Sequence, residues 1–259
     1  MDPLPAWQAI FWAIHQGDLP ALAGLLNNGA DPDARDPHGN TPLIKAARAG
    51  LHSAVGLLCG RGADTNAQNN AGLAALHEAS RNGHGEAIRA LLGQGAQADA
   101  RSGAGETPLG LAVGGGHAGA VAVLLQGGAD PEARMPDDGS TALILATRLA
   151  RDDVIRALLA GAADVTDLSA ADQTELQAAS TGTRSPAVLE LLSGAGAQID
   201  LGSAVLMGKR GGADAVTQGG AEQPCVEGAR KGSWAAGGVR WRLSVPGLWE
   251  GQWLRGAVL

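Results

Sequence analysis

One pattern of apolar residues recurs along the first 200 residues of this chain with a nearly constant period. A leucine returns in steps of 33, 33, 34 and 33 residues, and an alanine follows it three places later each time. A branched aliphatic residue keeps the same register further along. Three independent series that share one period indicate a chain built from stacked copies of one short unit. The series are Leu43, Leu76, Leu109, Leu143 and Leu176; Ala46, Ala79, Ala112, Ala146 and Ala179; and Val55, Ile88, Val121, Ile155 and Val188.

Residues 36–63 show what one unit contains. Thr41 and Pro42 predict a helix start, because the threonine hydroxyl can accept a hydrogen bond from a first-turn amide and proline at the first helical position loses none. Gly50 predicts a left-handed end to that helix. A second apolar helix follows, in which we expect Cys59 to be a small buried residue. Each helix has only about two turns and must therefore pack against its neighbours to be stable.

The repeated unit resembles the ankyrin repeat. The segments GNTPLIKAARAG, ETPLGLAVGGGH and STALILATRLA match its first helix, and GADPDAR, GADTNAQ and GADPEAR match its turn between units. The resemblance covers about residues 5–200. It implies an all-α, ankyrin-type solenoid of about six stacked helix-turn-helix repeats, with loops projecting from one side. The expected repeats span about residues 5–35, 36–68, 69–101, 102–135, 136–168 and 169–200.

The chain departs from the family pattern at two places. The Thr-Pro-Leu-His motif keeps its histidine only at His77, where Ala74 and Ala75 replace the threonine and the proline. The glycine between the helices becomes Ala150 in the fifth unit and Thr183 in the sixth. A left-handed residue other than glycine costs about 1 kcal/mol. We therefore expect the array to be most stable between about residues 29 and 134.

Residues 201–259 lose the register of the repeats. This Gly/Trp-rich segment carries seven Lys and Arg against four Asp and Glu, whereas the first 200 residues carry 12 against 22. LGSAVLMGKR could begin a seventh unit, but no second helix follows it. We expect a disordered or irregular C-terminal tail, and a reading frame shifted near residues 209–213 would explain the abrupt change. Contact of its tryptophans and arginines with a membrane or a nucleic acid is the functional alternative.

No arrangement of catalytic or metal-binding residues is recognisable in the sequence. His77 and His84 lie seven residues apart with a glycine between them, whereas the zinc-protease motif places its histidines four apart on one helix. We expect His84 and His117 to be structural. The acidic pair Asp137 and Asp138 is typical of solvated residues near a helix start. The prediction is a protein that is not an enzyme and has no cofactor or metal.

The resemblance implies a non-enzymatic protein-protein interaction module, or scaffold, with a concave binding surface made of loops and first helices. A regulatory subunit or inhibitor of a specific enzyme is the alternative, and an enzyme with an unrecognised site is less favoured. No stretch approaches the roughly 18 apolar residues needed to cross a membrane. The formal net charge of −7 argues against general binding of nucleic acid. We expect a cytoplasmic monomer that binds another protein and neither membrane nor nucleic acid.

The family resemblance places partner contacts at the loop tips and just before the glycine between the helices. Arginine predominates at the latter place and at the end of the turn between units, which predicts two basic rows. Because arginine binds carboxylates bidentately, we expect an acidic segment of the partner to bind there. The alternative is that these arginines only favour helix ends or are neutralised by nearby acids. The predicted contact residues are His15, Arg48, Arg81 and Arg148 in the first row; Arg35, Arg101 and Arg134 in the second; and His38, Asn40, Asn70, Glu106, Asp138 and Ser140 at the loop tips.

Overall fold

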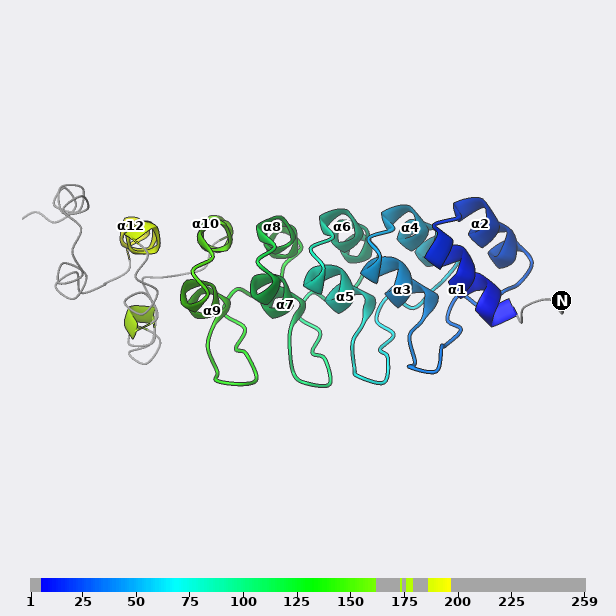
Figure 1. Ribbon diagram of the computed structural model, residues 1–259, viewed down its shortest axis with the longest axis horizontal. Coiled ribbons are helices and arrows are strands. Elements are labelled where there is room, and N and C mark those ends of the chain that lie inside the picture. The colour runs from blue at the N-terminus through cyan, green and yellow to red at the C-terminus, as the bar shows by residue number, and fades with distance from the viewer. Residues whose placement is uncertain (1–5, 162–172, 174–175, 179–185, 197–259) are drawn as a thin grey trace, which may run out of the picture. The chain divides into compact units, whose positions relative to one another are not determined.

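The computed structural model of the chain describes residues 6–161, 173, 176–178 and 186–196. These residues form short helices arranged in pairs that stack side by side, and loops project from one side of the stack (Figure 1). No strand occurs among the residues described. The arrangement confirms the all-α, ankyrin-type solenoid. The remaining residues, including most of the predicted sixth repeat and all of residues 201–259, lie outside the description, so the predicted repeat boundaries and tail stay predictions.

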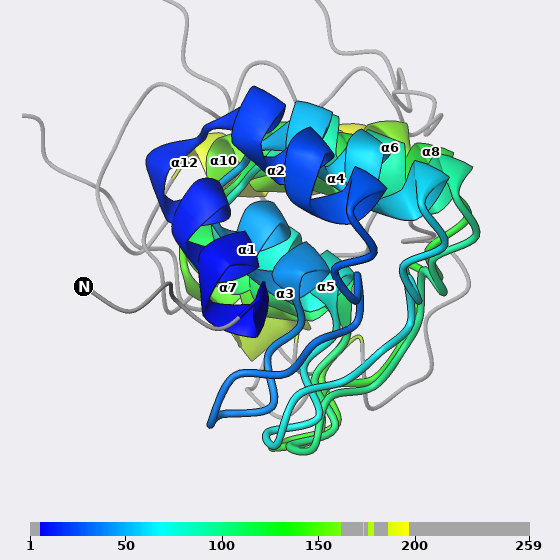
Figure 2. The ribbon, with the colours of Figure 1, turned by 90° about the vertical axis from the view of Figure 1, so that its right-hand side faces the viewer.

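The two helices of each pair differ in where they lie. The first helices are α1 (Ala6–Gln16), α3 (Pro42–Arg48), α5 (Ala75–Arg81), α7 (Pro108–Gly115) and α9 (Ala142–Arg148). The second helices are α2 (Leu19–Asn27), α4 (His52–Gly60), α6 (Gly85–Gly93), α8 (Ala118–Gln126) and α10 (Asp152–Ala160), and α12 (Pro186–Gly194) packs against α10. Viewed along the stack, the first helices form one layer and the second helices another (Figure 2).

The core lies between these two layers and consists of the residues that the period singles out. First helices pack against neighbouring first helices, and second helices against neighbouring second helices. Every member of the three predicted series within the described residues is buried. Ala179 lies outside them. The prediction that Cys59 is buried is wrong, because this residue is only half-buried. Its partial burial raises the pKa of its thiol.

Three first helices begin with the predicted threonine cap, and in a fourth a histidine takes the place of the threonine. The hydroxyl oxygen of Thr41 accepts a hydrogen bond from the amide of Ile44 at 3.3 Å, and Thr107 and Thr141 act in the same way. Helix α5 begins after an alanine and has no such cap. There the Nδ1 atom of His77 accepts from the amide of Ala74 at 3.2 Å. The lone histidine of the family motif thus serves the helix start that lacks a threonine.

The ends of the first helices require a left-handed residue, as predicted. Gly50 has a φ of +72° and Gly83 a φ of +75°. At each of them a Cβ atom would also lie within 2.7 Å of the imidazole ring of the next repeat's histidine. Ala150 occupies the same conformation with a φ of +51° and is the one non-glycine residue with positive φ in the described part of the chain. The strain expected at this position is therefore present.

The loops of the second, third and fourth units are joined to one another by main-chain hydrogen bonds. The amide of Asn70 donates to the carbonyl of His38 at 3.1 Å, and the amide of Gly103 donates to the carbonyl of Ala71 at 3.0 Å. The corresponding place in the next loop is Pro136, which has no amide hydrogen to donate. The ladder of loop contacts therefore cannot continue at that position, which is also where the sequence carries its one-residue insertion.

Candidate functional site

The predicted contact residues lie along two lines that run across the stacked repeats. The residues that lie at the end of a first helix, or one residue before it, form what we call the helix-end row: His15, Arg48, Arg81, Gly114 and Arg148. We call Arg35, Gln68, Arg101 and Arg134, which follow the turns between units, the loop row. Equivalent residues of neighbouring repeats lie side by side in the stack (Figure 1). The two rows have different surroundings.

Carboxylates alternate with the arginines of the helix-end row. Glu78 of α5 lies between Arg48, whose Nε is 3.5 Å from its Oε2, and Arg81, whose Nη1 is 3.9 Å from its Oε1. Arg81 also reaches Oε2 of Glu106 in the next loop at 3.5 Å. The side chain of Glu78 is only 5% exposed, whereas that of Arg48 is 59% exposed. The row is therefore a chain of alternating charge and not a uniformly basic strip.

No motif in the sequence marks Glu78 as part of the site. It lies two residues after the repeated leucine, the position that Lys45 occupies in the preceding unit. The periodic register could have shown that a carboxylate here would lie beside the arginines. The two predicted contact residues that it joins, Arg48 and Arg81, remain exposed.

Three predicted contact residues of the fourth loop and α9 form one cluster. Nη2 of Arg148 lies 2.6 Å from Oδ2 of Asp138 and donates to the hydroxyl of Ser140 at 3.1 Å. The amide of Ser140 donates to Asp138 at 3.0 Å. Hydrogen bonds from Ser140 and Arg148 lower the pKa of Asp138 to about 2. Ser140 is buried, so its prediction as a loop-tip contact is wrong.

Asn40 is also buried, and its prediction as a loop-tip contact is wrong for a similar reason. Its side-chain amide donates to both carboxylate oxygens of Asp36, and its carbonyl oxygen accepts from Asn69 at 2.9 Å. Lys45 pairs with Asp36 at 3.0 Å. Burial acts to raise the pKa of Asp36, but the hydrogen bonds from Asn40 and Lys45 outweigh it and lower the pKa to about 2. Asn40 therefore fixes its own loop.

The loop row joins neighbouring loops. Arg35 donates to the carbonyl of Gln68 at 2.8 Å, Gln68 donates to that of Arg101 at 3.1 Å, and Arg101 donates to that of Arg134 at 3.3 Å. Arg134 donates to the carbonyl of Gly139 at 2.8 Å. These side chains remain exposed, but their donors serve main-chain carbonyl groups. The row thus has a structural use that the sequence analysis did not assign to it.

The acidic residues of the turns serve the backbone as well. The carboxylate of Asp33 accepts from the amide of Asp64 at 3.0 Å, and that of Asp99 accepts from the amide of Asp130 at 3.0 Å. In the second unit Asn66 plays the same part. These contacts link each turn to the next one along the stack.

The remaining predicted contact residues are exposed, except Glu106, which is half-exposed. His38 and Asn70 lie at neighbouring loop tips, and the side-chain amide of Asn70 donates to the carbonyl of Pro37 at 3.4 Å. His15 lies at the end of α1, with its ring stacked on Trp12 at a centroid distance of 6.0 Å. Glu106 is half-exposed beside Arg81. The loop tips therefore present both polar and charged groups to the solvent.

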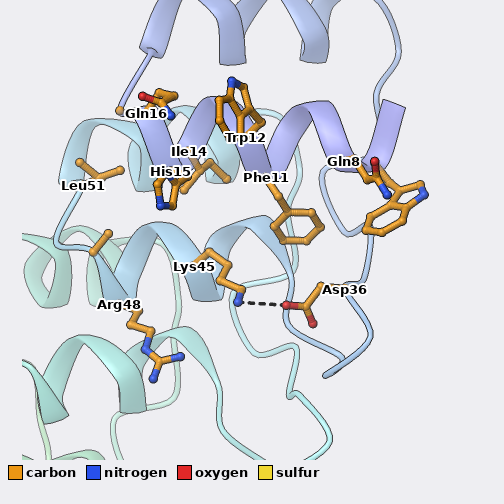
Figure 3. Close-up of a pocket in the computed structure, with 13 residues that line it drawn as sticks. Gln8, Phe11, Trp12, Ile14, His15, Gln16, Asp36, Lys45, Arg48 and Leu51 are labelled. Atoms are coloured by element: carbon orange, nitrogen blue, oxygen red, sulfur yellow. Dashed lines mark ion pairs between the residues drawn. The ribbon is translucent and has the colours of Figure 1, made fainter. Parts of the chain in front are cut away.

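A groove of about 820 Å³ lies at the α1 end of the helix-end row. Trp7, Phe11 and Trp12 of α1 line it, together with Lys45 and Arg48 of α3. Figure 3 shows Phe11 of α1 and Lys45 of α3 in the space between these two helices. The ring of Trp7 contacts that of Phe11 edge to face, with the centroids 6.4 Å apart. Sequence analysis did not single out this groove. The one feature of the sequence that could have indicated the groove is Trp12, because the next two units carry Lys45 and Glu78 at the same position of the repeat.

The described residues contain no group of three or more His, Cys, Asp or Glu side chains that could hold a metal ion. Within the same residues no helix is long and apolar enough to cross a bilayer. The geometry of this part of the chain thus offers a polar surface and one apolar groove.

A family model described as ankyrin repeats, in three copies, matches residues 10–102 and again residues 76–169. The chain belongs to the ankyrin repeat family. The two matches overlap and extend over more than half of the sequence. No curated protein matches the chain. Ankyrin repeats generally mediate protein–protein interactions, so binding of another protein is the function that the family supports.

Proposed function

We propose that this chain is a non-enzymatic module that binds one partner protein across the helix-end row and the exposed loop tips. The observation that carries the proposal is the fixed geometry of these exposed groups. Main-chain hydrogen bonds and the loop row hold neighbouring loops together. Ion pairs to Glu78 hold Arg48 and Arg81. A surface that is ordered before its partner arrives loses less conformational entropy on binding.

The alternation of charge along the helix-end row indicates which charges the partner's surface should carry. Two uninterrupted basic rows would favour an acidic segment of the partner along the whole array. Because Glu78, Glu106 and Asp138 alternate with the arginines, an acidic segment would meet repulsion at each of them. A partner surface of alternating charge suits the middle and the α9 end of the row. An acidic segment of the partner suits the α1 end, where Lys45 and Arg48 line the surface together with Asp36.

A regulatory subunit or an inhibitor of an enzyme would use the same surface on a narrower choice of partner. A general scaffold would bind several partners there. The number and identity of the proteins that bind to the helix-end row distinguish these two forms of the proposal.

The test compares capture of proteins from the native lysate by the wild type and by a helix-end variant. The variant carries Arg48→Ala, Arg81→Ala and Arg148→Ala together with Glu78→Gln, because Glu78 would otherwise keep a buried charge without a partner. The matched control carries Arg61→Ala, Arg89→Ala and Arg156→Ala, which remove three arginines from the second-helix layer. We expect the captured partner to be lost with the first variant only. Equal capture by both variants would contradict the proposal.

A further inference from the structure

The aromatic residues of the array are confined to one helix. Trp7, Phe11 and Trp12 lie on α1, and the sequence has no other aromatic residue before Trp234. Trp7 is 40% exposed and Trp12 is 59% exposed. Exposed apolar side chains that gather on one face commonly mark a binding surface.

The repeat itself does not demand these rings. The positions in the following first helices that correspond to Trp12 hold Lys45, Glu78, Leu111 and Leu145. Phe11 occupies the place of Ile44 and His77. The first helix thus carries aromatic rings that these copies lack at two of the positions that line the groove. Figure 3 shows Phe11 and His15 pointing from α1 towards α3, across the groove.

The groove has a local charge opposite to that of the array. Lys45 and Arg48 line it together with one carboxylate, that of Asp36. Lys45 pairs with Asp36 at 3.0 Å. The nearest carboxylate to Arg48 belongs to Glu78, at 3.5 Å on the side of the next helix. The charged residues that line the groove are therefore two cations and one carboxylate, and Glu78 balances Arg48 in part from the next helix. The first 200 residues, by contrast, carry 22 acidic groups against 12 basic ones.

We propose that this groove receives a segment of the partner protein in which a bulky apolar side chain is followed or preceded closely by acidic residues. The apolar side chain packs against Trp7, Phe11 and Trp12, and a carboxylate pairs with Arg48. Aromatic residues and arginine in a desolvated groove are the usual main contributors to binding energy. This inference rests on the proposed function and names the chemistry of the partner at one end of the same surface.

Charge argues against the other occupants. Residues 201–259 of this chain contain four tryptophans, but they also carry seven basic groups against four acidic ones. They would bring positive charge to a groove that Lys45 and Arg48 already line. A second copy of the chain would have to present an apolar and acidic segment. Among the residues that the structure describes, the exposed large apolar side chains other than the two tryptophans are Leu19 and Leu149.

The experiment is a selection from a phage-displayed library of random peptides with the full-length chain as bait. We expect the enriched peptides to contain Leu, Ile, Phe or Trp within a few residues of two or more Asp or Glu. One enriched peptide, labelled with a fluorophore, is then titrated with the wild type and with variants by fluorescence anisotropy. Trp12→Ala should weaken binding by about 10-fold or more, as expected for an aromatic anchor.

Arg48→Ala in a Glu78→Gln background should lower the affinity for the same peptide by about 5-fold at low salt. The effect should be smaller at high salt, because salt screens the ion pair between Arg48 and the peptide's carboxylate. Leu149→Ala, which removes an exposed apolar side chain at the other end of the array, is the control and should leave the affinity unchanged. Glu78→Gln alone is the second control. Circular dichroism of each variant confirms that the helices are retained.

The outcomes that would overturn the inference are distinct from those that concern the proposed function. If Trp12→Ala leaves the affinity for the peptides unchanged but Arg81→Ala or Arg148→Ala lowers it, the peptides do not bind in the groove. That result would support binding at the helix-end row. Peptides insensitive to every one of these changes would contradict both. Enrichment of basic, tryptophan-rich peptides would make residues 201–259 the occupant. Self-association in sedimentation that Trp12→Ala abolishes would make it a second copy.

Discussion

The Nε2 atom of His117 lies 3.0 Å from the carbonyl oxygen of Arg81, the last residue of α5. The same contact joins His84 to the carbonyl of Arg48 at 3.1 Å, one repeat earlier. Each ring lies over the glycine of the preceding repeat, where a Cβ atom would collide with it. These histidines therefore satisfy a helix-end carbonyl and fix the distance between repeats. The expected structural role of His84 and His117 is thereby supported by geometry.

His117→Ala should destabilise the array by about 1 kcal/mol, because the carbonyl of Arg81 loses its side-chain partner. The change is measured by urea unfolding followed by circular dichroism. His52→Ala is the matched control, since His52 is exposed at the start of α4, and its effect should be within roughly 0.5 kcal/mol of zero. Equal effects of the two substitutions would show that the His117 contact contributes nothing.

Ala150→Gly should stabilise the array by about 1 kcal/mol, because Ala150 has a φ of +51° and glycine adopts this conformation without strain. The matched control is Ala49→Gly, at a residue with a φ of −84°. There glycine relieves no strain and should destabilise by roughly 0.5–1 kcal/mol through its greater freedom in the unfolded chain. Urea midpoints of both variants give the comparison. A loss of stability in both would mean that the strain at Ala150 is compensated elsewhere.

The fold could be predicted because the period fixes which residues share a position. Leu109 and Val121 are buried for the same reason as their counterparts one repeat away, and one unit therefore predicts the rest. Thr41 and Gly50 add local signals that depend only on their own backbone. Nothing beyond the sequence was needed for these features.

The candidate surface was harder to predict. The repeat period shows which residues occupy equivalent positions, but it does not show whether a polar side chain at such a position is exposed or buried. Asn40 and Ser140 are buried because each turns towards a carboxylate or an arginine of its own unit. Glu78 is buried because arginines of two neighbouring helices cover it. Such contacts depend on several side chains at once, so no single pattern in the sequence marks them.

Arg48→Ala combined with Arg81→Ala should destabilise the array by roughly 2 kcal/mol, because the buried carboxylate of Glu78 loses both of its cations. Adding Glu78→Gln should recover most of this loss, since the group left in place is then neutral. The measurement is the free energy of unfolding in urea for the double and triple variants. Arg89→Ala is the control, because Arg89 pairs with Glu86 in solvent, and such exposed pairs contribute about 0–1 kcal/mol. Absence of recovery by Glu78→Gln would contradict the charge explanation.

The stability of the array should fall as the pH drops below about 6.5, the ordinary pKa of histidine. Burial lowers the pKa of His77, and its hydrogen bond to Ala100 opposes this effect only in part. Its Nδ1 atom accepts from Ala74, and its Nε2 atom lies 2.9 Å from the carbonyl of Ala100, so Nε2 carries the proton of the neutral ring. Protonation of Nδ1 would remove that acceptor.

Because the folded-state pKa lies below the unfolded one, the unfolded chain binds more protons in this window, and acid favours unfolding. His77→Gln keeps an acceptor and a donor but does not titrate, so its unfolding free energy should change less than that of the wild type between about pH 7 and pH 5. The comparison is made by urea unfolding at several pH values, with His38→Gln, at an exposed loop tip, as the control. A wild type and a His77→Gln variant with parallel pH profiles would show that His77 does not contribute to the loss of stability in acid.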